Sequence, residues 1–268
     1  MNERSTAGDA WPRFTPVADH ALLVSFGDAI ADDTSAAVLG LDRALADSPP
    51  PGMAECVPAL VNLLIDFDPV VTDHEQVRAH VERLLRTSSR GQAPGQLREV
   101  EVCYDEDFAP DLAAVARTVD LSIDDVVNNH LQAQYVVRMY GFAPGYAYLS
   151  GVPRAIQVPR KPAAVRGIAA GSVLIAGPQC LVSTLTMPTG WSIIGRSPTR
   201  ILTPNERVPF LFAVGDTVRF VRIDRAQYEA RKATEREQAE REQAEREQAE
   251  REQAERDLTE REQTERHA

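Results

Sequence analysis

The N-terminal third of the chain carries two alternating hydrophobic patterns. Short apolar runs at residues 21–26 and 61–67 end in turn-forming residues, as β-strands do. After each run, apolar side chains recur at helical spacing, over about 34–47 and 74–86. This order of strand, helix, strand and helix predicts a small sheet with helices packed on it.

A polar segment at 88–96 follows and contains glycine and proline, which is typical of a hinge. Residues 100–104 then alternate like a strand, and 110–117 and 122–131 show helical spacing. Ser122, followed three residues later by an acidic residue, predicts a capped start for the second of these helices.

The stretch from Gln134 to Gly151 is rich in aromatic residues. Its first seven residues alternate like a strand, and glycine and proline then break the period. The aromatic residues within it are Tyr135, Tyr140, Phe142, Tyr146 and Tyr148. Rings on a stiff backbone suit the wall of a small-molecule or partner pocket, because they combine apolar area with polar tips. The alternative for any single ring is that it fills the core beside a turn.

Beyond residue 151, short apolar runs alternate with glycine and proline. The predicted strands are 155–158, 172–176, 181–186, 191–194, 200–202 and 217–223. Many short strands without a helical pattern predict a nearly closed β-barrel, because closure removes exposed strand edges.

The C-terminal segment from Thr234 repeats a five-residue unit, Ala/Thr-Glu-Arg-Glu-Gln. A five-residue period advances an α-helix by about 140° per unit, so its alanines form no seam and we expect no coiled coil. Arginine and glutamate recur four residues apart, as Arg241 does with Glu237 and Glu245. The pattern predicts a solitary charged helix that makes no contact with the core.

Together these patterns predict an α+β protein with four parts. We assign residues 1–14 to a disordered N-terminus, 15–133 to an α/β N-terminal domain, 134–225 to a β-barrel domain and 226–268 to a charged helical tail.

Composition argues against several classes of function. The formal net charge is -11, and no basic stripe is present that would bind a phosphate backbone, so we expect no nucleic-acid partner. No apolar run is long enough to cross a bilayer, and the N-terminus lacks the pattern of a signal peptide. We therefore expect a cytoplasmic protein without membrane contact.

Cysteine and histidine show no metal or nucleophile pattern. Cys56, Cys103 and Cys180 form no Cys-x-x-Cys pair, and we interpret them as small buried apolar residues. The five histidines lack metal-ligand spacing and are expected at the surface, so we predict no metal site. Neither a Gly-x-Ser-x-Gly motif nor a Walker loop occurs. If ATP is used, another chain therefore contributes much of its site.

Side chains beside the turns of the barrel half are the candidate ligand-binding groups. Arginine suits an anionic small molecule, because guanidinium binds carboxylate or phosphate oxygens through paired hydrogen bonds. The alternative is that each arginine is simply solvated. No catalytic residue is identified, and the candidate substrate-binding residues are Arg138, Tyr140, Phe142, Gly145, Tyr148, Arg160, Gln179, Trp191 and Arg196.

Ordered blocks of sequence match a known family over about residues 15–224. The blocks are Gly141–Leu149, Pro159–Arg160, Ala170–Val173, Ala176–Gln179, Pro188–Trp191 and Ile194–Pro198, with further matches at Ala21–Asp28, Val57–Pro58, Asp68–Pro69 and His130. In these residues the chain resembles the allophanate hydrolase subunit 1 family. That family includes the B subunit of bacterial 5-oxoprolinase, a sporulation-kinase inhibitor, and the C and D subdomains of the urea carboxylase carboxyltransferase region.

Two departures from the family pattern fall near the expected pocket. Thr189 stands where a glycine is usual, and the segment Cys180–Ser183 lacks a usual aromatic residue. These departures leave room for a different substrate.

The resemblance implies an α/β domain followed in the chain by a cyclophilin-like barrel. It also implies a partner equivalent to allophanate hydrolase subunit 2, the C subunit. A LamB/YcsF-type A subunit is a further implied partner. The implied activity is the ATP-dependent opening of 5-oxoproline to glutamate, with ATP shared with or supplied by the partner chain. Two other functions fit the same family. One is a regulatory protein that inhibits a histidine kinase, and the other is a carboxyltransferase component of a biotin-dependent urea or amide carboxylase.

Overall fold

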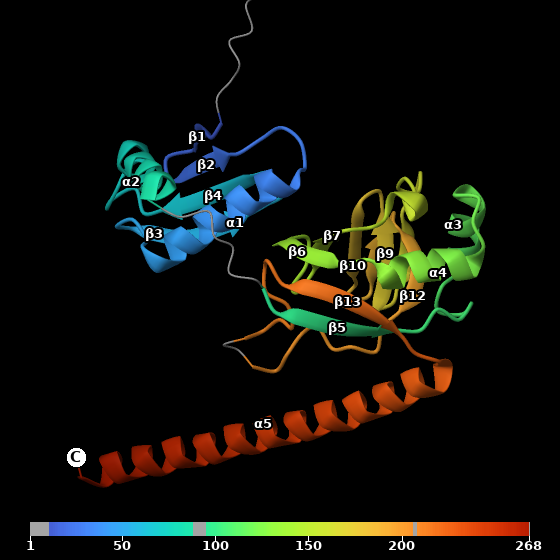
Figure 1. Cartoon of the computed structure of the whole chain (residues 1–268). Helices are drawn as coiled ribbons and strands as arrows, with labels where there is room; N and C mark the ends of the chain where they lie inside the picture. Colours follow the sequence, from blue (N-terminus) through green and yellow to red (C-terminus); the bar gives the residue numbers. More distant parts are fainter. Residues whose placement is uncertain (1–10, 88–94, 206–207, 268) are drawn as a thin grey trace, which may run out of the picture.

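The computed structural model describes residues 11–87, 95–205 and 208–267. It contains two bodies built on β-sheets, which follow one another along the chain, and a long C-terminal helix that runs beneath the second body (Figure 1). This arrangement agrees with the α+β fold predicted from the sequence.

The N-terminal body is a two-layer structure. Its antiparallel sheet has the order β1-β2-β4-β3. The elements are β1 (Arg13–Val17), β2 (Ala21–Ser25), α1 (Asp32–Asp47), β3 (Met53–Pro58), β4 (Asn62–Phe67) and α2 (His74–Thr87). Leu22 lies opposite Ile65 and Val24 opposite Leu63, so these four side chains share one face of the sheet. Both helices cover that face, because their buried residues join the same core cluster.

The second body is a nearly closed barrel with the strand order β12-β9-β10-β7-β6-β13-β5. Its strands are β5 (Leu97–Val102), β6 (Tyr135–Tyr140), β7 (Ala147–Ser150), β9 (Ser172–Ala176), β10 (Gln179–Val182), β12 (Ser192–Arg196) and β13 (Thr217–Arg222). Only the β13–β5 pair is parallel among the described pairings. Two backbone hydrogen bonds between Cys103 and Arg196, 2.8 and 2.9 Å long, join the ends of β5 and β12. The two edge strands of the sheet therefore meet there.

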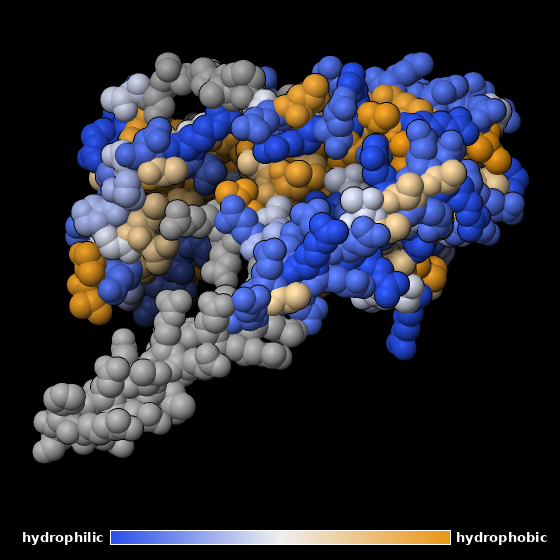
Figure 2. Space-filling model, turned by 90° about the horizontal axis from the view of Figure 1, so that it is seen from below, coloured by the Kyte–Doolittle hydropathy of each residue, from blue (hydrophilic) through white to orange (hydrophobic). Residues whose placement is uncertain are grey.

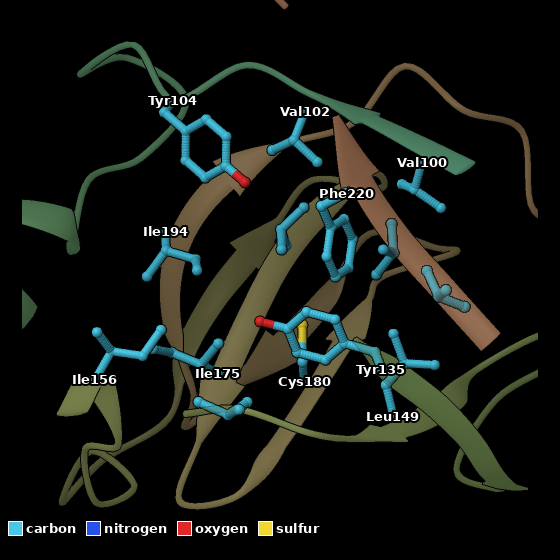
Figure 3. Close-up of a cluster of buried hydrophobic side chains, with 14 of the residues drawn as sticks. Val100, Val102, Tyr104, Tyr135, Leu149, Ile156, Ile175, Cys180, Ile194 and Phe220 are labelled. Atoms are coloured by element: carbon cyan, nitrogen blue, oxygen red, sulfur yellow. The ribbon is translucent and has the colours of Figure 1, made fainter. Parts of the chain in front are cut away.

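One hydrophobic core fills this barrel. Figure 3 shows side chains from β5, β9, β12 and β13 pointing into a common interior, among them Val100, Ile175, Ile194 and Phe220. Buried residues of α3 (Leu112–Thr118) and α4 (Ile123–Gln132) belong to the same cluster. Ser122 caps α4 as predicted, since its hydroxyl accepts a hydrogen bond from the Asp125 backbone N–H at 3.0 Å.

The strand pairing places the start of the barrel body earlier in the chain than the boundary predicted between residues 133 and 134. The strand β5 pairs with β13 over six residues, and α3 and α4 pack on the barrel, so the barrel body begins at about Leu97. Pattern reasoning failed here because a parallel pair joins strands that are distant in sequence. The predicted hinge at 88–96 lies mostly outside the described residues.

Several smaller expectations were also wrong. Residues 154–156 form a 3₁₀ turn, η1 (Arg154–Ile156), in place of a strand, and Leu202 makes only an isolated bridge to Phe210. A two-stranded ribbon that the sequence did not indicate, β8 (Val165–Ile168) with β11 (Met187–Thr189), lies beside the barrel. At the N-terminus, residues 1–10 lie outside the described part, whereas Arg13 and Phe14 begin β1 and contradict disorder to residue 14.

The C-terminal helix α5 (Arg225–His267) confirms the predicted helical tail, but its isolation from the core was wrong. Tyr228 is buried with Cys103, Phe108 and Ile223, and its ring centre lies 4.5 Å from that of Phe108. The repeat period describes only the part of α5 after Thr234, so it carried no information about this first turn.

Asp216 fastens the two parallel strands of the barrel together. Its buried carboxylate accepts hydrogen bonds from the Gln96 backbone N–H at 2.8 Å, the Arg98 guanidinium at 3.0 Å and the Ala213 backbone N–H at 3.0 Å. Replacing Asp216 with alanine removes all three bonds and leaves their donors unpaired, so we expect a loss of about 3 kcal/mol in the free energy of unfolding.

Urea denaturation of the two proteins measures this loss. The control is Asp47→Ala at the exposed last residue of α1, where we expect a change within about 0.5 kcal/mol. Equal stabilities of Asp216→Ala and Asp47→Ala would contradict the fastening role of Asp216.

Candidate functional site

The aromatic stretch folds into a β-hairpin. The strands β6 and β7 pair antiparallel, and residues 141–146 form the corner between them. Tyr148 therefore lies on a strand, although the sequence placed it in a loop. Tyr146 and Trp191 pack with Leu174 and Leu181 on the outer face of the sheet, with Ile168 and Met187 of the β8–β11 ribbon against them.

Two residues of this corner have left-handed backbone angles. Gly145 has φ +68°, and a Cβ at this position would lie 2.7 Å from Leu202 Cδ2, so both the conformation and the space require glycine. Phe142 has φ +73° and a ring that is 72% exposed. A bulky residue in this conformation is rare, and such strain is concentrated at functional sites.

A continuous series of ring contacts leads from Phe142 to an exposed arginine. The ring centres are 5.5 Å apart for Phe142 and Tyr146, 6.0 Å for Tyr146 and Tyr148, and 5.9 Å for Tyr148 and Trp191. The Arg160 guanidinium then lies 5.5 Å from the centre of the Trp191 ring. We call Phe142, Tyr148, Arg160 and Trp191, with Tyr146 beneath them, the aromatic rim.

The aromatic rim combines buried and accessible groups. Trp191 and Tyr146 are buried, Tyr148 is half-buried, and Arg160 is exposed. Burial raises the pKa of Tyr146 to about 12, so its hydroxyl stays protonated at neutral pH. The rim thus offers an apolar wall, tyrosine hydroxyls and one cation at its edge, which suits a small anionic ligand.

The other substrate-binding candidates from the sequence lie outside the aromatic rim. A register shift in β6 between Val137 and Met139 turns Arg138 into the protein, where its Nε donates to Ser150 Oγ at 2.6 Å. Gln179 pairs with the same Ser150 across β7 and β10. Arg138 and Gln179 therefore lie together at the far end of the hairpin from the corner.

The side chains of Tyr140 and Arg196 also contact other parts of the protein. The Tyr140 hydroxyl donates to the Phe212 carbonyl at 2.7 Å, and burial raises its pKa. Arg196 ends the strand that Trp191 precedes, and its guanidinium lies 5.5 Å from the Phe108 ring near the start of α5. Its Nε is buried without a hydrogen-bond partner in the described part of the chain.

Thr189, the residue that departs from the family pattern, positions the rim. Its hydroxyl accepts a hydrogen bond from the Trp191 backbone N–H at 3.1 Å. Lys161, the neighbour of Arg160, donates to the Asp111 carboxylate at 2.5 Å, and Asp111 also accepts from the Ile193 backbone N–H at 2.7 Å. Sequence spacing gave no signal for the Asp111 contacts, because Asp111 lies 50 residues from Lys161 and 82 residues from Ile193.

The histidine and cysteine expectations need correction. His130 is fully buried in the barrel and His80 is buried in the N-terminal body, whereas both were expected at the surface. The Tyr104 hydroxyl lies 2.8 Å from His130 Nδ1, and Cys180 Sγ lies 3.7 Å from His130 Nε2. Cys180 thus faces the interior and not the rim. Cys103 is buried as predicted, but Cys56 is only half-buried.

Burial keeps the side chains of His130 and Cys180 uncharged. It lowers the pKa of His130 to about 3 and raises the pKa of the Cys180 thiol, so both groups are neutral at pH 7. A thiol that stays protonated is a poor nucleophile. The His130–Cys180 contact is therefore part of the core.

The described residues contain neither a membrane-spanning helix nor a cluster of metal ligands. None of their helices combines the length and the apolar character needed to cross a membrane. Over the same residues, no group of three or more histidine, cysteine, aspartate or glutamate side chains is arranged to hold a metal ion.

Comparison with known proteins decides the family. The family model named carboxyltransferase domain, subdomain C and D, matches residues 12–212, which include the N-terminal sheet, every strand of the barrel sheet except β13, and the aromatic rim. The chain belongs to this family. Within the carboxyltransferase subdomain C and D family, it is similar to the 5-oxoprolinase B subunit of Bacillus subtilis, with 36% identity over 80% of this chain and 94% of that protein. It is 34% identical to the 5-oxoprolinase B subunit of Escherichia coli O157:H7, over 64% of this chain and 78% of that one.

Solved structures extend the comparison. The protein TTHA0988 matches 77% of this chain with a TM-score of 0.68 and 32% identity, and the match spans only 40% of TTHA0988. The Kluyveromyces lactis urea carboxylase matches 81% of this chain with a TM-score of 0.65 and 15% identity, over 22% of that protein. The second likeness shows the fold alone. In both solved proteins, the fold found here is one part of a longer polypeptide.

Proposed function

We propose that this chain is the B subunit of an ATP-dependent 5-oxoprolinase that opens 5-oxoproline to glutamate. The observation that carries the proposal is the 36% identity to the 5-oxoprolinase B subunit of Bacillus subtilis over 94% of that protein. A match of this length covers the aromatic rim as well as the fold.

The proposal includes a second polypeptide. The aromatic rim is an open surface with a cation at its edge, and a reaction that uses ATP needs a site closed to bulk water, so that ATP is not hydrolysed without the substrate. A protein related to allophanate hydrolase subunit 2, the C subunit, covers the rim in this proposal, and a LamB/YcsF-type A subunit joins the complex. The match to only 40% of TTHA0988 supports an additional protein part beside this fold.

Each group of the rim then has a role. Arg160 binds the carboxylate of 5-oxoproline or a phosphate oxygen, and Tyr148 and Trp191 enclose the ring of the substrate. ATP is a second substrate: transfer of its γ-phosphoryl group to the amide oxygen releases ADP, and addition of water to the activated carbon then breaks the ring C–N bond and releases phosphate and glutamate. The chain has no Walker loop, so the partner chain supplies most of the ATP site.

Reconstitution tests this proposal. We expect the chain to co-purify with a C-subunit homologue from the same organism, and the complex to hydrolyse ATP faster when 5-oxoproline is added, with glutamate formed. Each chain alone is the control and should show no stimulation. Formation of a stable complex without stimulation by 5-oxoproline would refute the substrate. Inhibition of a histidine kinase, or carboxyl transfer from carboxybiotin to urea, would replace the proposal with one of the other two functions.

A further inference from the structure

A cavity of about 490 Å³ lies between the barrel and α5, and none of the aromatic-rim residues lines it. The barrel contributes Ser183, Ser197 and Arg200 to its wall, and α5 contributes Lys232, Ala239 and Glu242. Its volume is in the range of small-molecule sites, which is roughly 300–1,000 Å³. Figure 2 views the molecule from the side of α5 and shows hydrophilic residues along the described part of that helix.

The first turn of α5 is fixed to the barrel. Tyr228 is buried against Phe108, and Arg231 contacts the Glu101 carboxylate through several hydrogen bonds of 3.0–3.3 Å. These contacts set the direction in which the helix crosses the barrel. They bring Glu242, in the repeat segment, to the cavity wall.

At the cavity, Arg200 holds a carboxylate of the chain itself. Its NH1 donates to Glu242 Oε2 at 2.8 Å, and its Nε donates to the Leu202 carbonyl at 2.9 Å. The hydrogen bond to the Leu202 carbonyl orients the guanidinium. The hydrogen bond to Glu242 occupies the side of the guanidinium that would bind an anion. The hydroxyls of Ser183 and Ser197 already bond to neighbouring backbone groups. Arg200 is therefore the group in the barrel wall of this cavity that is built to bind an anion.

The Arg200–Glu242 pair is exposed enough to be exchangeable. The two side chains keep 37% and 23% of their surface accessible. Ion pairs at this level of exposure contribute little to stability and are screened by salt. Within α5, Gln238 Nε2 donates to the other carboxylate oxygen of Glu242 at 2.9 Å.

We propose that the cavity is a binding site for a small oxyanion, carboxylate or phosphate, and that Glu242 occupies Arg200 in its place until the ligand arrives. Binding of the ligand displaces Glu242 and releases the part of α5 beyond its anchored first turn. The C-terminal helix is then a strap over the cavity: it lies against the barrel when the cavity is empty and is released when an anion is bound. This inference does not depend on the proposed 5-oxoprolinase activity, because the cavity lining shares no residue with the aromatic rim.

Photo-crosslinking in the full-length chain measures the strap directly. A benzoylphenylalanine at position 239, which lines the cavity, should crosslink to the barrel segment 197–204, and mass spectrometry of the digest locates the product. The same probe at Arg241, two residues further along α5 and outside the cavity lining, is the control and should give no such product.

Anions are then compared at constant ionic strength. Sodium phosphate and sodium succinate, each matched by sodium chloride, should lower the crosslink yield by about fivefold if the anion competes with Glu242. A response to phosphate alone or succinate alone identifies which oxyanion the cavity takes. Equal yields in all three salts would refute the competition.

Charge exchange gives a second, independent test. Arg200→Glu and Glu242→Arg should each lose the crosslink, and the double variant Arg200→Glu/Glu242→Arg should recover it. The double variant should no longer respond to phosphate or succinate, because its barrel wall carries a carboxylate. Recovery with an unchanged anion response would show that the anions act elsewhere and would overturn the proposal.

Discussion

Lowering the pH from about 7 to about 4 is expected to reduce the free energy of unfolding by about 3 kcal/mol through His130 alone. Burial lowers the pKa of this imidazole from the ordinary 6.5 to about 3 in the folded protein. A base whose pKa is lower in the folded state binds protons preferentially when unfolded. The contribution of neutral His130 to the free energy of unfolding is therefore complete above about pH 6.5 and is lost as the pH falls towards 3.

The surroundings of His130 explain why its charged form is so unfavourable. The ring lies 4.4 Å from that of Phe220 and 5.2 Å from that of Tyr135, within the core of the barrel. Neutral imidazole with the proton on Nε2 satisfies both contacts, because Nδ1 then accepts from the Tyr104 hydroxyl and Nε2–H faces Cys180 Sγ. No carboxylate approaches the ring among its described contacts, so a second proton finds no counter-charge.

Urea denaturation between pH 4 and pH 7.5 measures this effect. The variant His130→Gln cannot titrate, so it should lose stability at every pH but show a shallower decline on acidification, by about 3 kcal/mol over the range. Asn128→Gln, at an exposed position of the same helix α4 that carries no titratable group, is the control and should keep the wild-type slope. Parallel curves for the wild type and His130→Gln would contradict a neutral buried His130.

The second large effect is expected at Arg160. Replacing it with alanine should lower the 5-oxoproline-dependent turnover of the reconstituted complex by about 100-fold, which corresponds to about 2.7 kcal/mol of lost transition-state binding. The guanidinium is the cation at the edge of the aromatic rim and stacks on Trp191. Since Arg160 is exposed, we expect little change in stability and an intact complex.

Two variants make this test specific. Arg160→Lys keeps the charge but loses the paired hydrogen bonds, so its turnover should lie between those of wild type and Arg160→Ala. Arg117→Ala, at an exposed arginine in the last turn of α3, is the matched control and should be fully active. Steady-state ATP hydrolysis with and without 5-oxoproline provides the measurement. Unchanged turnover in Arg160→Ala would remove this residue from the site.

For several candidate residues, the local conformation and surroundings were predictable from the sequence. Gly145 has a positive φ that its position between two strands demands, and Tyr148 and Trp191 belong to the aromatic and glycine-rich blocks that drew attention to the hairpin. Arg138 and Arg196 were placed at the rim because they lie beside turns in the sequence. The register shift in β6 and the position of Arg196 at the end of β12 turn both side chains away from it.

The sequence by itself determined the local elements of this protein: the alternation in β6, the helical spacing of α1 and α2, the Ser122 cap and the charged repeat of α5. These depend on periodicity and on side chains that bond a few residues away, which are visible in a single chain. Only the tertiary structure decided that β5 joins the barrel, that Tyr228 anchors the tail and that Arg200 meets Glu242. Each of these contacts joins residues far apart in sequence, and such pairings are selected by the burial and fit of the whole fold, which no local pattern records.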